Sequence, residues 1–331
     1  TTYYEVTEKL KLQNVLAAQV GYEVYPLDAK ITESSTISFL DVTSLAGYKI
    51  YQAALKFLFY VAVSELYPDA EVTFLHSVPK GILSEIRMPH NLTAEEISKI
   101  KGHMASIVEK KERFYKYRLD NQDAFHYFKN HGEEEKAYNV QNVAKEVITV
   151  YRLRNHINYF YTMMPYDTGV INRFELVFLG RNRIVLVCPN VTSGNHIPEY
   201  VHYENIVANF MASKKWLRKM QVPYLSQMNN LVSSSKIEDF IHSNEIVYQE
   251  DLLTACEKII SLRDVKLVLI AGPSSSGKTT TMKRLSAILR SHGYDPIGLS
   301  TDDFFVNRKD TPKNEKGEYD YECIPVSYTH L

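Results

Sequence analysis

The sequence has few cysteines and no excess of either charge. Its three cysteines, Cys188, Cys256 and Cys323, lie far apart and are odd in number, which argues against a disulfide framework and favours a reducing compartment. Basic residues number 38 and acidic residues 39, and the formal net charge is -1. This balance excludes a global electrostatic signature for nucleic acid or anionic lipid, so at most a local basic patch is expected.

Long apolar runs are missing as well. The most apolar stretch, ALKFLFYVAVSEL, is too short and too closely flanked by polar residues to span a bilayer. The first residues, TTYYEVTEKLKLQ, lack the charged and then apolar pattern of a signal peptide. We therefore expect a cytoplasmic protein with no membrane role.

The N-terminal part of the chain has the mixed patterns of an α+β region. Short β-branched runs predict strands, and FELVFLGRNRIVLVCP predicts a hairpin that turns near residues 180–182. Thr93 and Glu96 have the spacing of a capping box, which predicts the start of a helix. The apolar residues that follow share one helical face: Ile97, Ile100, Met104, Ile107 and Val108.

A glycine-rich segment near the C-terminus predicts a phosphate-binding loop. KLVLIA, residues 266–271, is a short apolar run typical of a buried parallel strand, and KTTTMKRLSAILRSHG continues as an amphipathic helix. Between them the sequence satisfies G-x-x-x-x-G-K-[ST], in which backbone N–H groups and a helix N-terminus bind phosphate oxygens. The predicted nucleotide-binding residues are Gly272, Pro273, Ser274, Ser275, Ser276, Gly277, Lys278, Thr279 and Thr280.

Four side chains in and after this loop have predicted chemical roles. Lys278 is placed to neutralise the β- and γ-phosphates of ATP, and the Thr279 hydroxyl is the expected Mg²⁺ ligand. PIGLST then predicts a second strand that ends at Asp302 and Asp303. Either carboxylate could take a proton from an acceptor hydroxyl, or could instead cap a helix or a turn, and the residues alone leave both interpretations open.

GPSSSGKTTTMKRL, LSTDDFFVNR and GEYDYE together resemble the uridine kinase and phosphoribulokinase family, in particular bacterial nucleoside kinases with a long N-terminal extension. The resemblance implies an α/β P-loop kinase domain with a doubly wound parallel sheet. It implies that Asp302 is the base on the nucleoside 5′-hydroxyl and that Asp320, otherwise an acidic loop residue, holds the ribose hydroxyls. Lys278 and Asp302 are then the catalytic residues of an ATP- and Mg²⁺-dependent phosphotransferase acting on uridine or cytidine.

The N-terminal extension resembles parts of aminoacyl-tRNA synthetases. VLAAQVGYEVYPLDAKITESSTISFLDV is similar to the latter half of a TGS domain. YQAALKFLFYVAVSELYPDAEV through AFHYFKNHGEEEKAYNV resembles the second additional domain of threonyl- and alanyl-tRNA synthetases. That domain holds an H-x-x-x-H and a C-x-x-x-H pair, but Thr43 and Gly47 occupy the first pair here, and TMMPYDTG stands near the second. No zinc is therefore expected.

These patterns predict four parts: a partial TGS-like unit at 1–45, a synthetase-like α+β domain at 46–210, a helical connector at 211–262, and the beginning of the kinase domain at 263–331. The stretch from Lys266 to Leu331 is too short for a doubly wound kinase domain. We therefore expect an inactive fragment, truncated at the C-terminus, that lacks the Walker B acid, the lid and most of the acceptor pocket. The oligomeric state is left open.

Other functions remain open at this point. The acceptor could be another small alcohol, such as a sugar phosphate or pantothenate. The chain could instead be a regulatory module in which the synthetase-like region binds RNA or a nucleotide and the glycine loop only senses ATP. Zinc-dependent editing of a mischarged tRNA is the weakest alternative, because the zinc ligands are missing.

Overall fold

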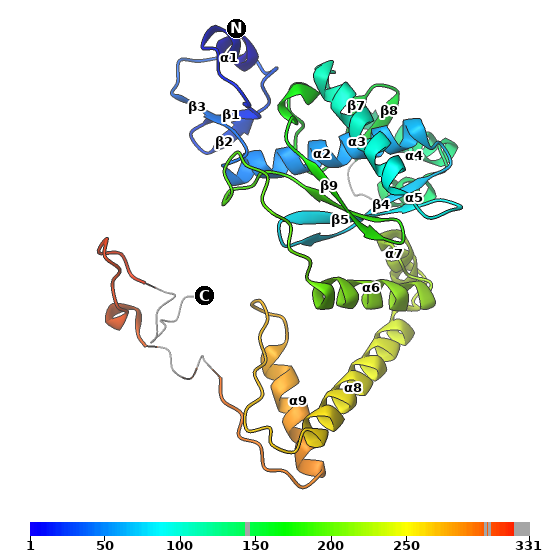
Figure 1. The fold of residues 1–331 in the computed structure, drawn as a ribbon, viewed down its shortest axis with the longest axis vertical. Coiled ribbons are helices and arrows are strands. Elements are labelled where there is room, and N and C mark those ends of the chain that lie inside the picture. The colour runs from blue at the N-terminus through cyan, green and yellow to red at the C-terminus, as the bar shows by residue number, and fades with distance from the viewer. Residues whose placement is uncertain (143–145, 301–302, 304–305, 321–331) are drawn as a thin grey trace. The chain divides into compact units, whose positions relative to one another are not determined.

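The computed structural model describes residues 1–142, 146–300, 303 and 306–320 (Figure 1). The chain divides into two compact units, Thr1–Asn230 (unit 1) and Leu231–Leu331 (unit 2). We describe each unit by itself. Across the described residues, no helix has both the length and the apolar character that a membrane crossing requires.

Unit 1 contains three sheets within its described residues, and every pairing in them is antiparallel. In the first, β1 (Ala17–Val20) lies between β2 (Glu23–Tyr25) and β3 (Ile37–Leu40). The second has the order β4 (Glu71–Val78), β5 (Gly81–Arg87), β10 (Arg183–Val187), β9 (Glu175–Gly180). The third has the order β6 (Tyr115–Asp120), β7 (Val147–Leu153), β8 (His156–Tyr159). The predicted hairpin is thus the β9–β10 pair.

The core of unit 1 forms around α2 (Leu45–Leu66), a helix that is apolar on almost every side. Such a helix is stable only when other elements surround it. The main core cluster joins α2 to the second sheet through Ile82 and Leu186, and to the first sheet through Ala17 and Leu40. The predicted TGS-like unit at 1–45 therefore shares its core with the predicted synthetase-like domain, and the boundary between them stays a prediction.

Helix α3 (Ala94–Glu109) begins as the sequence predicts. The Glu96 N–H donates to the Thr93 hydroxyl at 3.2 Å, and the Thr93 N–H donates to the Glu96 carboxylate at 2.8 Å. The predicted apolar face packs into the main core, with four of its five residues buried and the last, Val108, partly buried.

Shorter helices complete unit 1. They are α1 (Tyr3–Lys9), α4 (Asn121–Asn130), α5 (Glu134–Gln141), the 3₁₀ turn η1 (Thr168–Val170) and α6 (Glu204–Lys219). Helix α7 (Leu225–Ser233) begins in unit 1 and crosses the boundary at Asn230. Helices α4 and α5 bury Phe128 and Val140 against Ile148 of the third sheet. Helix α6 packs Val207 with Val185 of the second sheet. Cys188 is a buried free thiol, and burial raises its pKa to about 12.

Unit 2 is built on two packed helices, α8 (Ile237–Ser261) and α9 (Lys278–Ser291), with a short 3₁₀ turn at Arg308–Asp310. Their contact buries Leu252, Cys256, Leu285 and Leu289. The Tyr248 hydroxyl lies 2.7 Å from the Thr281 hydroxyl across the same contact. Helix α9 follows the glycine loop, as the sequence predicts.

The described part of unit 2 contains no β-strand. Residues 266–271 run without regular structure, and Leu267 and Leu269 are 71% and 82% exposed. A buried parallel strand needs neighbouring strands and covering helices, and the described residues of unit 2 supply no such neighbour. The doubly wound parallel sheet is therefore not seen and stays a prediction.

Candidate functional site

The glycine loop of unit 2 turns directly into α9. Gly277 stands at the N-cap with φ +81°, a left-handed conformation that glycine adopts without strain. The Thr281 N–H is bonded to the Gly277 carbonyl at 2.8 Å, so the N–H groups of the helical residues before it have no acceptor inside the helix. A loop that presents free N–H groups at a helix N-terminus has the local geometry of an anion site.

Lys278 reaches back across this loop. Its ammonium group donates to the Pro273 carbonyl oxygen at 2.7 Å. At the other end, a Cβ on Gly272 would lie 2.7 Å from the Ser276 hydroxyl oxygen, so the loop is closely packed there. The remaining predicted loop residues are exposed, Thr279 and Thr280 on the first turn of α9 among them.

The acids predicted to act with the loop are only partly described. Asp302, the predicted base, lies outside the described residues. Its neighbour Asp303 accepts the Ser300 N–H at 3.2 Å and so closes a turn, which agrees with the capping interpretation for that acid. Asp320 donates its backbone N–H to the Pro312 carbonyl at 2.8 Å. A constellation of Lys278, Asp302 and Asp320 stays a prediction.

In unit 1 the segment around Gly47 lies beside the segment TMMPYDTG. These are the two segments that were compared with the zinc-binding pairs of the synthetases. A hollow of about 410 Å³ lies between the first turns of α2 and residues 162–163 of TMMPYDTG. Its lining is apolar apart from Lys49 and Thr162, and it comprises Val24, Leu45, Ala46, Lys49, Ile50, Thr162 and Met163. Across the described residues, no group of three or more His, Cys, Asp or Glu side chains could hold a metal ion.

Zinc does not fit this hollow. A Cβ on Gly47 would lie 1.8 Å from the carbonyl oxygen of Asp41, so the position has no room for a histidine. Thr43 bonds the Asp41 carboxylate through both its N–H and its hydroxyl, at 2.9 and 2.5 Å. The ligand positions are therefore occupied by residues that build the turn before α2, and no zinc-dependent step can be assigned to them.

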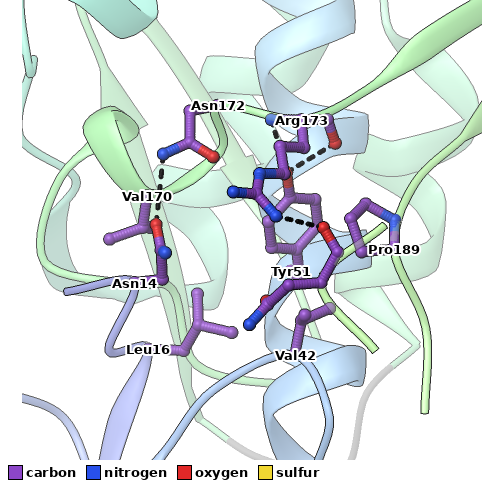
Figure 2. Close-up of a pocket in the computed structure, with 9 residues that line it drawn as sticks. Asn14, Leu16, Val42, Tyr51, Val170, Asn172, Arg173 and Pro189 are labelled. Atoms are coloured by element: carbon purple, nitrogen blue, oxygen red, sulfur yellow. Dashed lines mark hydrogen bonds between the residues drawn. The ribbon is translucent and has the colours of Figure 1, made fainter. Parts of the chain in front are cut away.

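A second, very small pocket lies beside α2, and hydrogen bonds among the residues that line it hold it closed (Figure 2). Its volume of about 10 Å³ holds about one water molecule. Asn172 donates to Asn14 at 3.1 Å, Tyr51 bonds the backbone of Arg173, and the Arg173 guanidinium donates to the carbonyl of Asn195. The pocket serves structure rather than substrate binding.

The third sheet carries a feature that the sequence analysis missed. Tyr4 and Tyr166 stack with ring centroids 3.7 Å apart and an interplanar angle of 11°. The guanidinium of Arg113 lies 3.9 Å from the centroid of the Tyr166 ring and 5.6 Å from that of Tyr115. An aromatic and cationic stack therefore runs from α1 to the start of β6.

Arg152 of β7 extends this stack. Its guanidinium lies 5.0 Å from the centroid of Tyr115 and 5.4 Å from that of Tyr117. We call the whole set the Tyr–Arg row: Tyr4, Tyr166, Arg113, Tyr115, Arg152 and Tyr117. The available signal was RFYKYRL, in which aromatic and basic residues alternate. Basic groups interleaved with aromatic rings are typical of single-stranded nucleic-acid interfaces.

Comparison with known proteins points to tRNA ligases. No protein-family model matches the chain. It is 28% identical over 144 residues to the threonine–tRNA ligase of Ehrlichia chaffeensis, which covers 43% of this chain and 23% of that protein. Against the ligase of Symbiobacterium thermophilum it is 26% identical over 163 residues, 49% of this chain and 25% of the ligase. Against that of Wolbachia pipientis it is 23% identical over 177 residues, 53% of this chain and 28% of the ligase.

These relatives correct the kinase interpretation. The chain spans about a quarter of the length of the curated relatives that it matches. The relatives are named as ligases of threonine and tRNA, not as enzymes that transfer phosphate to a nucleoside. The assignment to the uridine kinase family is therefore wrong, and with it the predicted phosphotransferase activity and the predicted nucleoside substrate. What the similarity supports is a tRNA-synthetase-like domain.

Proposed function

We propose that the chain is a tRNA-synthetase-related RNA-binding module and that unit 1 binds tRNA. The similarity to threonine–tRNA ligases carries this proposal. Each match reported above, over 144, 163 and 177 residues, is longer than the whole of unit 2, Leu231–Leu331, so each includes part of unit 1. The features likened to synthetases also lie in unit 1.

Unit 1 is proposed to bind RNA without editing it. The resemblance places Thr43 and Gly47 at the first histidine pair of the synthetase domain, and Gly47 has no space for a side chain. The hollow beside them is lined mainly by apolar groups. Hydrolysis by a metal-bound water needs ligands that this hollow does not offer.

We further propose that the glycine loop of unit 2 binds ATP with Mg²⁺ as a ligand that regulates the module. The left-handed Gly277, the N–H groups of the first turn of α9 that have no acceptor within the helix, and the ammonium of Lys278 at the loop support phosphate binding there. Lys278 would contact phosphate oxygens, and Thr279 would hold the metal ion.

The proposal is tested by equilibrium binding of the full chain to fluorescently labelled tRNA specific for threonine, with a DNA duplex of similar length as the reference. Because the formal net charge is only -1, non-specific attraction to a polyanion is weak. We expect tighter binding to tRNA at physiological salt, with an affinity that falls as salt rises. Equal affinity for tRNA and for the DNA duplex would contradict the proposal.

A further inference from the structure

We propose that the Tyr–Arg row is a docking surface for unpaired bases of RNA. This inference deepens the proposed RNA binding and rests on it. It assigns the contact to the open end of the third sheet and not to the hollow beside α2.

The row is accessible where it crosses β6. Tyr115 and Tyr117 are 44% and 39% exposed. Tyr115 pairs directly with Arg152, and Tyr117 with Val150, so these side chains share one face of the sheet. Further along that face, Ile148 packs with the cluster formed by α4 and α5. The face is therefore covered at one end and open at the other.

The guanidinium groups of Arg113 and Arg152 are positioned mainly by contacts with tyrosine rings. Each has a buried Nε atom without a hydrogen-bond acceptor, and within the described residues the only ion pair of Arg113 is a long contact of 3.8 Å with Asp28. Arg152 makes no ion pair within the same residues. A guanidinium positioned by stacking keeps its terminal nitrogens as donors, and their fork geometry matches a phosphate.

The charge around the row is mixed. Lys111, Lys116 and Arg118 are exposed in the same stretch of chain. Lys116 and Arg118 alternate with Tyr115 and Tyr117 along β6, so they lie on the opposite face of the sheet from the row. The two acids of that stretch already have partners, since Glu112 pairs with a guanidinium at 3.5 Å and Asp120 accepts an N–H of the first turn of α4 at 2.7 Å. Asp28, Asp167 and Glu8 also lie within electrostatic reach of the row. The phosphates of an RNA strand would therefore be attracted by the guanidinium groups of Arg113 and Arg152 themselves and not by a general excess of positive charge.

Unpaired bases are the occupant that this chemistry selects. An exposed tyrosine ring offers one face to a base, and a neighbouring guanidinium adds a cation above a π system. Bases inside a duplex are stacked on one another and cannot reach such rings, whereas the loops and ends of a folded RNA can. The alternation of rings and cations along the row matches a strand in which bases and phosphates alternate.

Binding of the full chain to a fluorescein-labelled unstructured RNA of about 12 nucleotides and to tRNA tests the inference. We expect Tyr117→Ala to weaken binding of both by roughly 5- to 100-fold, because loss of one base–aromatic stack has that effect. Tyr117→Phe keeps the ring and should bind as the wild type does. Tyr22→Ala, which removes a fully exposed ring outside the row, should change nothing.

The outcomes separate the two proposals. Wild-type affinity of Tyr117→Ala and Arg152→Gln for tRNA would overturn the docking surface and leave the RNA-binding function standing. Failure of the wild-type chain to bind either RNA would overturn both. The unstructured RNA annealed to its complementary strand supplies a duplex of the same sequence. Equal affinity of the wild-type chain for the single strand and for this duplex would overturn the choice of unpaired bases. Circular dichroism and thermal melting of each variant show whether a loss of binding reflects unfolding, and Tyr117→Phe supplies a folded comparison.

Discussion

The Tyr51 hydroxyl donates to the Arg173 carbonyl oxygen at 2.7 Å and accepts the Arg173 N–H at 3.1 Å (Figure 2). Tyr51 belongs to α2, and Arg173 belongs to the segment that leads into β9. Burial raises the pKa of this hydroxyl, so it remains a protonated donor over the physiological range. One buried side chain thereby joins the central helix to the second sheet.

Removing this hydroxyl should destabilise unit 1. Tyr51→Phe leaves the N–H and the carbonyl of Arg173 without their partner, and we expect a loss of about 1–3 kcal/mol in the free energy of unfolding. Urea denaturation of the two proteins measures the difference. Tyr22→Phe is the matched control, because its ring is fully exposed. If Tyr51→Phe lowers the free energy of unfolding by less than about 0.5 kcal/mol, the Tyr51 hydroxyl contributes no more than a typical surface group, and the prediction is wrong.

Two glycines in helices should respond to alanine in opposite directions. At Gly47 a Cβ would lie 1.8 Å from the Asp41 carbonyl oxygen, so Gly47→Ala should cost about 3 kcal/mol or more by overpacking. At Gly102 in α3 no atom lies within 4 Å of the added Cβ, so Gly102→Ala should stabilise by about 1 kcal/mol through helix propensity. Thermal melting compares both with the wild type, and similar shifts for the two variants would refute the contrast.

Stability should fall as the pH is lowered through the titration range of histidine. Burial lowers the pKa of His156, and the nearby Glu65 only partly opposes this; burial and then Lys214 lower the pKa of His76. The unfolded chain therefore binds protons more readily, so the contribution of these neutral rings is present above about pH 6.5 and is lost below it.

The measurement is the urea midpoint at about pH 7.5 and about pH 5.5. We expect a lower midpoint at the acidic value and a shallower pH dependence for His156→Gln. His196→Gln, which replaces an exposed histidine, should keep the wild-type pH dependence. A urea midpoint that is higher at the acidic pH would contradict the prediction, because groups other than His156 and His76 would then control the pH dependence of stability.

Nucleotide binding by unit 2 should depend on Lys278. Its ammonium contacts only the loop through Pro273 among the described hydrogen bonds, so Lys278→Ala should leave α9 folded and weaken Mg·ATP binding about tenfold or more. Isothermal titration calorimetry on the full chain gives both affinities. Lys283→Ala removes an exposed charge from the same helix and should bind normally. Equal affinities for both variants would exclude the loop as the site.

Local features of the fold were predictable from the sequence. The capping box at Thr93, the start of α9 after the glycine loop and the hairpin turn at residues 180–182 all depend on residues within one turn or loop. Each of these residues has a strong conformational preference of its own. Short-range patterns therefore located α3, the β9–β10 hairpin and the start of α9.

Features that depend on distant residues were not predictable in this way. The strand expected at 266–271 needs partner strands, and its own apolar pattern cannot supply them. In the Tyr–Arg row, strand pairing brings Arg152 to Tyr115, and packing of α1 brings Tyr4 to Tyr166; no window of sequence displays either contact. The family assignment failed for a related reason, because it rested on three short motifs, whereas the similarity to tRNA ligases extends over 144 to 177 residues.

Among the described strands, β6 pairs with β7 alone, so it lies at the edge of its sheet, where a strand of another copy of the chain could be added. Lys116 and Arg118 are exposed on this strand. Two such strands meeting side by side would bring like charges together, and proteins commonly place lysine on outer strands for this reason. These two positive side chains, on the face opposite the Tyr–Arg row, would therefore protect the protein against self-association.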